Sequence, residues 1–361
     1  TKDLIFYGRL SCFKLWGESN FDGIATDINR PSIPDSEGNL HVERAYINYF
    51  MPDANLSLTV GRLPTTEGPP SGLKENRTRK ATFPQLLIDG ETDGIFFNLH
   101  LSEFTDLKEA FARIVYSKVG QNWLEYQGVE MDEAIVPSLM FETQISDIEN
   151  SLLWLSYTMI LGVPPFAADL TSVMTGLPFD QNVVSFPEEA GQVGLYSLHV
   201  EFNDINKDGL DWFLSFIYGD IDPNSEGTLY DSGYEIGLFG DNLSGSLGES
   251  RSFSAFYTGL RYELQIEDLK NPKVGIEYNH GSKYWIAFNS VGSGNLIPKT
   301  GVRGDAYELY YIQPIDERHM FLRIGFVYMD YEYENPLTLY GSMSESDMTV
   351  LNGYMLMDVL F

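Results

Sequence analysis

Apolar and polar side chains alternate along most of the chain, in segments separated by Gly, Asn and Asp. In 193–203, Leu198 and Val200 lie on one face while His199 and Glu201 lie on the other. This period of two is typical of β-strands with unlike faces. It predicts fourteen strands, at about 3–16, 41–51, 56–63, 94–101, 109–119, 137–146, 151–162, 192–203, 210–220, 252–264, 273–288, 305–314, 320–333 and 350–361.

The predicted connections between these strands alternate in length. The short ones are 52–55, 102–108, 147–150, 204–209, 265–272 and 315–319, and the long ones are roughly 17–40, 64–93, 120–136, 163–191, 221–251, 289–304 and 334–349. Outer-membrane barrels have short periplasmic turns, long outer loops and an even number of strands. We therefore expect an all-β transmembrane antiparallel up-and-down β-barrel of about 14 strands, in a range of 12–16. One domain would span 1–361, with both ends on the short-turn side.

Two predicted strands are weakly marked, because 107–115 also fits a short amphipathic helix and 137–146 alternates irregularly. No apolar run approaches the ~18 residues of a transmembrane helix, since 151–164 is short and contains polar residues. Tyr and Trp concentrate near predicted strand ends, as in an aromatic girdle. The last segment, with its final Phe361, resembles the carboxy-terminal signature that the barrel-assembly machinery recognises.

The charge balance excludes several other classes of protein. Lys and Arg number 23 against 52 Asp and Glu, a net charge of −29, so we expect no nucleic-acid partner. The single cysteine, Cys12, excludes a disulfide scaffold and a multi-cysteine metal site. The start, Thr1-Lys2-Asp3-Leu4, lacks a charged leader followed by an apolar core, so we expect no signal peptide in this stretch.

Three stretches resemble a family of outer-membrane porins of unknown function found in proteobacteria. They are Gly61-Arg62-Leu63-Pro64-Thr65-Thr66-Glu67-Gly68-Pro69-Pro70 running through Lys74-Glu75-Asn76-Arg77 to Asp93-Gly94, then Glu277-Tyr278-Asn279-His280-Gly281-Ser282-Lys283-Tyr284-Trp285, then Arg303-Gly304-Asp305-Ala306-Tyr307-Glu308 through Gln313-Pro314. The similarity spans about 40–333. It implies a barrel in the outer membrane of a Gram-negative bacterium and, in other members, a signal peptide and a further amino-terminal segment. It implies no substrate.

If the apolar faces contact lipid, the polar faces line a lumen, since a charge in hydrocarbon costs about 2–4 kcal/mol at the midplane. The long loop 64–93 adds four basic residues and is a candidate lumen constriction. The lumen or constriction candidates are Arg9, Arg44, Arg62, Lys74, Arg77, Arg79, Lys80, Arg113, Glu201, Arg261, Glu263, Glu277, Glu308 and Arg323. Alternatively, the charges pair to fill a narrow barrel, and the loop is exposed and binds lipopolysaccharide phosphates.

The sequence favours a porin that passes small hydrophilic solutes or ions, embedded among lipid and lipopolysaccharide, with a homotrimer as one expected assembly. The alternatives are a scaffold barrel that houses or docks a partner, such as an electron-transfer protein, and a secreted β-sandwich. Asp204, Asn206 and Asp208 match the start of a calcium loop, but a plain hairpin turn explains them as well. No catalytic motif is present, so we expect no enzyme and no required cofactor.

Overall fold

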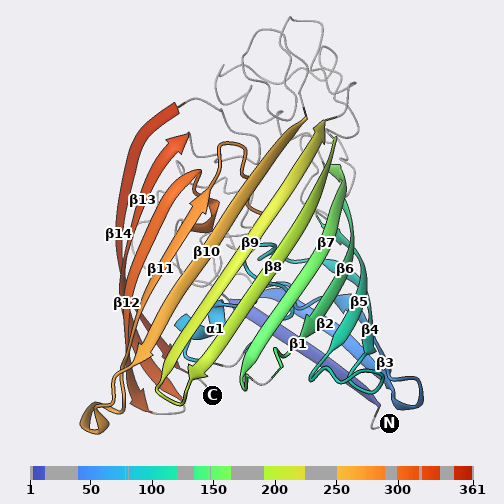
Figure 1. The fold of residues 1–361 in the computed structure, drawn as a ribbon, viewed down its shortest axis with the longest axis horizontal. Coiled ribbons are helices and arrows are strands. Elements are labelled where there is room, and N and C mark those ends of the chain that lie inside the picture. The colour runs from blue at the N-terminus through green and yellow to red at the C-terminus, as the bar shows by residue number, and fades with distance from the viewer. Residues whose placement is uncertain are drawn as a thin grey trace, which may run out of the picture.

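The computed structural model describes residues 3–12, 40–77, 79, 81–119, 134–146, 148–163, 191–223, 250–288, 299–316, 319–333 and 345–359. Fourteen strands follow one another in a single antiparallel sheet, each paired with its neighbours in the sequence (Figure 1). This is the up-and-down arrangement that the alternating pattern and the short turns predict. None of the helices in the described residues is long and apolar enough to cross a membrane.

The strands are mostly long enough to cross a bilayer when tilted. They are β1 (Leu4–Cys12), β2 (Leu40–Met51), β3 (Leu56–Arg62), β4 (Asp93–His100), β5 (Phe111–Val119), β6 (Ala134–Thr143), β7 (Ser151–Val163), β8 (Gly191–Ile205), β9 (Leu210–Pro223), β10 (Arg251–Glu263), β11 (Lys273–Gly281), β12 (Gly304–Asp316), β13 (Met320–Tyr333) and β14 (Glu345–Val359). The helices are short: η1 (Pro52–Ala54), α1 (Ser71–Lys74), η2 (Glu267–Leu269) and η3 (Lys299–Gly301).

All fourteen predicted strands are confirmed, and the helical alternative for 107–115 is wrong, because 107–110 form a turn and β5 begins at Phe111. One prediction is too long: β11 ends at Gly281, because residues 282–288 leave the sheet. The long connections at 17–39, 120–133, 164–190, 224–249, 289–298 and 334–344 lie outside the described residues.

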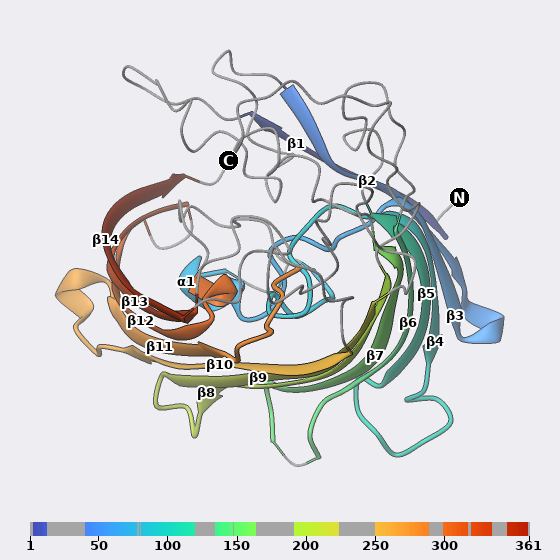
Figure 2. The same ribbon diagram turned by 90° about the horizontal axis from the view of Figure 1, so that it is seen from above.

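The sheet curls round an interior, with β1 and β14 as the two ends of its hydrogen-bonded order (Figure 2). Within the described residues, β1 pairs only with β2 and β14 only with β13. β1 begins and β14 ends at the edge that carries the short turns, as an even strand number requires (Figure 1). One continuous sheet of this kind is not a β-sandwich, so that alternative is wrong.

The outward face of the sheet carries large apolar side chains that are exposed, among them Ile114, Leu309 and Phe326. Between them along the same strands, the inward side chains are buried. The apolar face of the strands therefore points outward and the charged face inward, as predicted. In β13, Ile324 and Phe326 point outward, while Arg323 points inward and is buried.

The interior also contains an apolar core that the sequence did not suggest. Residues 63–92, here called the inward loop, fold across the hollow of the sheet, where α1 lies in Figure 2. Leu63, Leu73 and Leu86 of this loop pack in one cluster with inward-facing side chains such as Phe96 and Trp154. The expectation of a polar inner face is thus correct only in part, because the inward loop covers apolar wall residues.

Candidate functional site

The inward loop has its own local structure. Leu63 N–H donates to Thr92 O at 2.8 Å, which closes its base beside β3 and β4. Gln85 N–H donates to Pro69 O at 2.8 Å, which joins its two arms. Several prolines restrict the chain here and disfavour a long helix, so α1 has only four residues. A compact loop then presents its basic side chains to the surrounding wall.

Glu308 on β12 is the centre of the first charged cluster. Its carboxylate lies 2.8 Å from Lys74 Nζ of the inward loop, and it also binds Lys299 Nζ and accepts a hydrogen bond from Tyr354 OH. Lys299 pairs in addition with Glu277 on β11. All these charged groups are buried, so their charges are balanced by one another and not by water.

The two lysines of this cluster respond differently to burial. Burial lowers the pKa of Lys74 below its usual value, and the attraction of Glu308 offsets this only in part. Burial acts in the same direction on Lys299, but the carboxylates of Glu277 and Glu308 outweigh it, so the pKa of Lys299 is raised. Lys299 is therefore the more strongly held of the two ammonium groups.

A second cluster joins the inward loop to β5 and β6. Glu142 accepts hydrogen bonds from Arg79 Nη2 at 2.5 Å and from Arg113 Nη1 at 2.6 Å. Two guanidinium groups on one carboxylate form a strong charge-assisted arrangement. The loop and the wall are thereby linked at a point far round the sheet from Glu308.

A third cluster holds the end of α1 against β9, β10 and β11. Arg261 donates from Nε to Asp211 at 2.7 Å and from Nη1 to the carbonyl oxygen of Leu73 at 2.5 Å. Lys273 Nζ donates to Asn76 Oδ1 at 2.8 Å and lies 3.4 Å from Glu263. These contacts fix the height of α1 in the interior.

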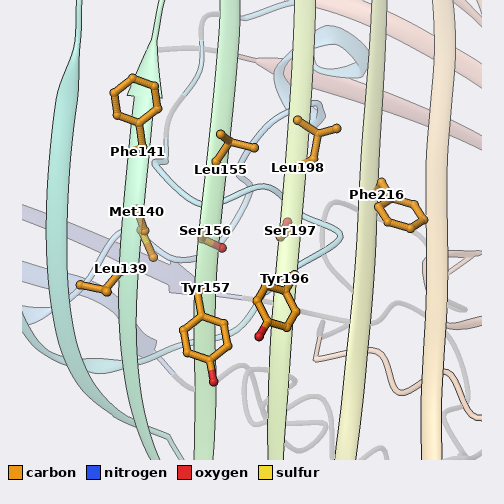
Figure 3. Close-up of a pocket in the computed structure, with 10 residues that line it drawn as sticks. All are labelled: Leu139, Met140, Phe141, Leu155, Ser156, Tyr157, Tyr196, Ser197, Leu198 and Phe216. Atoms are coloured by element: carbon orange, nitrogen blue, oxygen red, sulfur yellow. The ribbon is translucent and has the colours of Figure 1, made fainter.

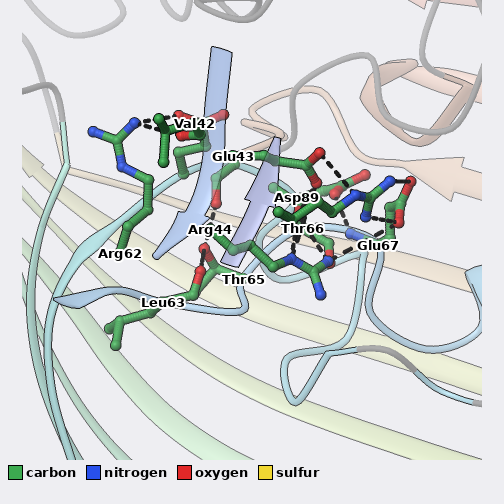
Figure 4. A network of polar contacts seen from close by, with 12 residues as sticks. Val42, Glu43, Arg44, Arg62, Leu63, Thr65, Thr66, Glu67 and Asp89 are labelled. Carbon is green, nitrogen blue, oxygen red and sulfur yellow. Dashed lines mark hydrogen bonds and ion pairs between the residues drawn. The ribbon is translucent and has the colours of Figure 1, made fainter. Parts of the chain in front are cut away.

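The loop also contacts strands near the start of the sheet, β1 and β2, and its last strand, β14. Arg9 on β1 pairs with Glu67 of the loop, and Arg44 Nη2 on β2 donates to Thr66 Oγ1 at 2.9 Å (Figure 4). On the opposite side, Arg77 Nη2 lies 3.4 Å from Asp358 of β14. One loop therefore contacts both β1 and β14.

Asp89 is a buried carboxyl within the loop. It accepts hydrogen bonds from Glu67 N–H at 2.7 Å and from Gln85 Nε2 at 3.1 Å (Figure 4). Burial, together with the nearby charges of Glu67 and Glu75, raises the pKa of Asp89 to about 7. The protonated acid is thus favoured by the folded loop over much of the acidic range.

The structure brings most of the candidate residues to the interior. Arg9, Arg44, Lys74, Arg77, Arg79, Arg113, Glu201, Arg261, Glu263, Glu277, Glu308 and Arg323 all lie on the inner face or in the inward loop. Lys80 lies outside the described residues. Arg62 is placed differently from the expectation: it shares a face of β3 with the exposed Val60 and pairs at 3.1 Å with Asp93.

Sequence reasoning missed a second inward segment, formed by residues 282–288 and 299–303. Trp285 Nε1 donates to Thr300 O at 2.7 Å, and Arg303 Nε donates to Trp285 O at 2.9 Å. Asp89 N–H of the inward loop donates to Phe288 O at 3.1 Å, which joins the two segments. The adjacent apolar pair at 285 and 286 breaks the period of two and could have marked this departure from the sheet.

Glu201 belongs to a hydrogen-bonded line of side chains on β8 and β9. His199 Nδ1 lies 2.7 Å from Ser215 Oγ, and its Nε2 lies 3.3 Å from Glu201 Oε2. Ser215, His199 and Glu201 follow one another in the order of the nucleophile, base and acid of a catalytic triad. His199 and Ser215 are fully buried, so the hydroxyl is not open to a substrate, and the line joins the two strands.

The candidate calcium loop is a hairpin turn between β8 and β9. Asp204 Oδ1 accepts a hydrogen bond from Gly209 N–H at 2.9 Å, and Lys207 N–H donates to Asp204 O. Within the described ranges, no group of three or more His, Cys, Asp or Glu is arranged to hold a metal ion. The geometry therefore supports the turn, with Asp204 as its stabilising side chain.

A single up-and-down sheet, apolar outside and charged inside, has the architecture of the outer-membrane β-barrel class. The chain belongs to the family described as "Protein of unknown function (DUF3373)", whose sequence profile matches residues 1–360. No curated protein matches the chain.

Two solved structures are similar to the chain at low sequence identity. One is OmpT folded in vitro, an outer membrane protein of Vibrio cholerae in its trimer form, with a TM-score of 0.48 and 9% identity over 89% of this chain and 81% of that one. The other is its loop L8 deletion mutant, with a TM-score of 0.43 and 8% identity over 82% and 76% of the two chains.

Proposed function

We propose that the protein is an outer-membrane porin of a Gram-negative bacterium, which passes small hydrophilic solutes or ions by passive diffusion. The observation that carries the proposal is the polarity of the two faces of the sheet. Outward side chains such as Leu309 are apolar and exposed, while Arg113, Glu277 and Glu308 point inward. A water-soluble sheet protein hides its apolar face, whereas a membrane barrel presents it to lipid.

A band of tyrosines on the outward face supports a membrane location. Tyr278 and Tyr307 have ring centroids 4.9 Å apart, and Tyr328 follows at 6.5 Å on the next strand. Tyr157 and Tyr196 are paired in the same way on β7 and β8, at 4.8 Å. Aromatic side chains gather at the level of lipid headgroups in such barrels.

A shallow apolar groove includes two of these tyrosines, Tyr157 and Tyr196. It is lined mainly by outward side chains of β6 to β9, namely Leu139, Phe141, Leu155, Tyr157, Tyr196, Leu198 and Phe216 (Figure 3). A surface of this composition suits contact with hydrocarbon chains. It therefore agrees with a lipid-facing wall.

The inward loop gives the proposed pore a constriction. Lys74, Arg77 and Arg79 of the loop pair with carboxylates of the wall at three separate points of the interior. These ion pairs hold the loop inside the sheet. Opposed charges in a narrow lumen sort solutes by size and charge. No bond is made or broken in this process, because the solute only diffuses.

Solute uptake into liposomes tests the proposal. Purified protein is incorporated into liposomes, which are then placed in isotonic solutions of neutral sugars of increasing size. We expect rapid swelling with the smallest sugars and none with the largest, because the constriction sets a size limit. Liposomes with inserted protein that do not swell in any sugar would contradict the proposal, and protease protection of the strands confirms the insertion.

A further inference from the structure

The short connection between β10 and β11, residues 264–272, exposes apolar side chains where a turn in water carries polar ones. Ile266 and Leu269 are 43% and 46% exposed. Ile266 precedes η2 and Leu269 ends it, and residues three apart in a 3₁₀-helix lie on the same side. Glu267 and Asp268 lie between them in sequence and point elsewhere. The turn therefore has an apolar side and an acidic side.

Backbone hydrogen bonds fix the shape of this turn. Leu264 N–H donates to Pro272 O at 2.7 Å, which closes its base. Asn271 N–H donates to Ile266 O at 3.1 Å, which closes its tip. Lys270 and Asn271 have φ values of 59° and 50°, so the chain reverses sharply after η2. The apolar side is thus a preformed feature of the turn.

Side-chain hydrogen bonds place the turn on the outer side of the sheet. Alternation along β12 puts Gln313 on the outward face with Leu309, and Gln313 Nε2 donates to Leu269 O at 2.7 Å. Lys270 Nζ donates to the carbonyl oxygen of Ile315, near the end of β12, at 2.5 Å. Figure 1 and Figure 2 both show this turn projecting beyond the curve of the sheet. It bends toward the apolar wall and away from the interior.

The apolar side of the turn continues the outward face of the strands. Tyr262 on β10 and Tyr311 on β12 both pair with Val274 on β11, so these outward side chains form one row across the sheet. Aromatic rows in such barrels mark the level of the lipid headgroups. Three exposed apolar side chains, here called the turn patch, lie together beyond this row: Ile266, Leu269 and Ile315.

We propose that the turn patch inserts into the periplasmic leaflet of the outer membrane and anchors the barrel there. This inference rests on the proposed outer-membrane location. The patch gains by leaving water, while Glu267 and Asp268 stay in it, as the two faces of an interfacial amphipathic helix do. The occupant is lipid and not a protein partner, because the patch lies on the outer side of the sheet, where the adjoining apolar wall faces lipid in the proposed membrane.

Fluorescent probes on single cysteines test this. Leu269→Cys and its matched control Asp268→Cys, on the acidic side of the same turn, are made in a Cys12→Ser background and labelled with an environment-sensitive dye. The protein is placed in phosphatidylcholine vesicles. Iodide on both sides of the membrane reports contact with water, and nitroxide-bearing lipids report depth. We expect the probe at position 269 about 5–10 Å below the headgroup surface, with less than half the iodide quenching seen at position 268.

A second variant separates the pull of the dye from that of the turn patch. The probe at position 269 is also read with Ile266→Asp and Ile315→Asp, which place charges on the patch. Iodide quenching should then rise toward the value at position 268, because the patch no longer favours the membrane. An unchanged depth would mean that the dye, and not the patch, enters the lipid, and would overturn the inference.

A labelled Leu309→Cys variant reports the wall itself and separates this inference from the proposed function. Lipid quenching at positions 309 and 269, but not at 268, supports the inference. Lipid quenching at 309 with equal iodide quenching at 269 and 268 overturns the inference alone, and is the result that a protein-docking surface would give in pure lipid. A probe at 309 that iodide reaches and lipid does not overturns the outer-membrane account as well.

Discussion

Replacing Glu308 with Gln removes the charge at the centre of the first cluster while keeping the size of the side chain. The amide cannot balance Lys74, whereas Lys299 keeps its ion pair with Glu277. Breaking a buried ion pair by removing one partner costs about 3–5 kcal/mol. We expect a loss of about 3 kcal/mol for Glu308→Gln, since Glu277 still holds Lys299.

The double variant with Lys74→Met tests the physical reason. If the loss arises from an uncompensated ammonium group, removing that group should recover at least about 1 kcal/mol relative to the sum of the single losses. Unfolding in urea from detergent micelles or lipid vesicles measures these free energies. Trp154 and Trp285 are buried in the interior cluster and report the transition by fluorescence. Strictly additive losses would refute the pairing of Lys74 with Glu308.

Three further predictions concern the inward loop and the wall. Because the folded state raises the pKa of Asp89 from 3.8 to about 7, the contribution of Asp89 to loop stability should be largest below about pH 4 and be lost as pH rises from 4 through 7. Asp89→Asn should flatten this profile in hydrogen exchange of residues 64–92, and an unchanged slope would contradict it. Leu86→Ala should cost about 2–5 kcal/mol in urea unfolding in detergent, against less than about 1 kcal/mol for the outward Leu309→Ala; equal losses would argue against loop packing. Gly275→Ala would place its methyl carbon 2.1 Å from the Tyr310 ring, so a loss of about 1–3 kcal/mol is expected by the same assay.

Strand positions are predictable here because their two faces meet different surroundings. The segment 320–333 is predicted and observed with identical bounds, since the outward residues Leu322, Ile324, Phe326 and Tyr328 alternate with inward residues along most of β13. The error at 273–288 has a physical cause. Trp285 and Ile286 are consecutive apolar residues that pack inside the curl, where no alternation is required.

The candidate site is less predictable, because its contacts join distant parts of the chain. Lys74 and Glu308 are 234 residues apart in sequence. Alternation assigns Glu308 to the inner face, but it gives neither the path of the inward loop nor the height at which α1 meets the wall. The same limit applies to Trp154, whose inward direction is predictable and whose partner Phe83 is not.

Single-channel recording in planar bilayers tests the central claim most directly. Purified protein is added to one side of the bilayer, and its insertion is verified independently. The porin account predicts discrete, stable conductance steps that scale with salt concentration. Inserted protein that gives no steps at any voltage tested would contradict it, and would mean that the inward loop and the second inward segment close the interior.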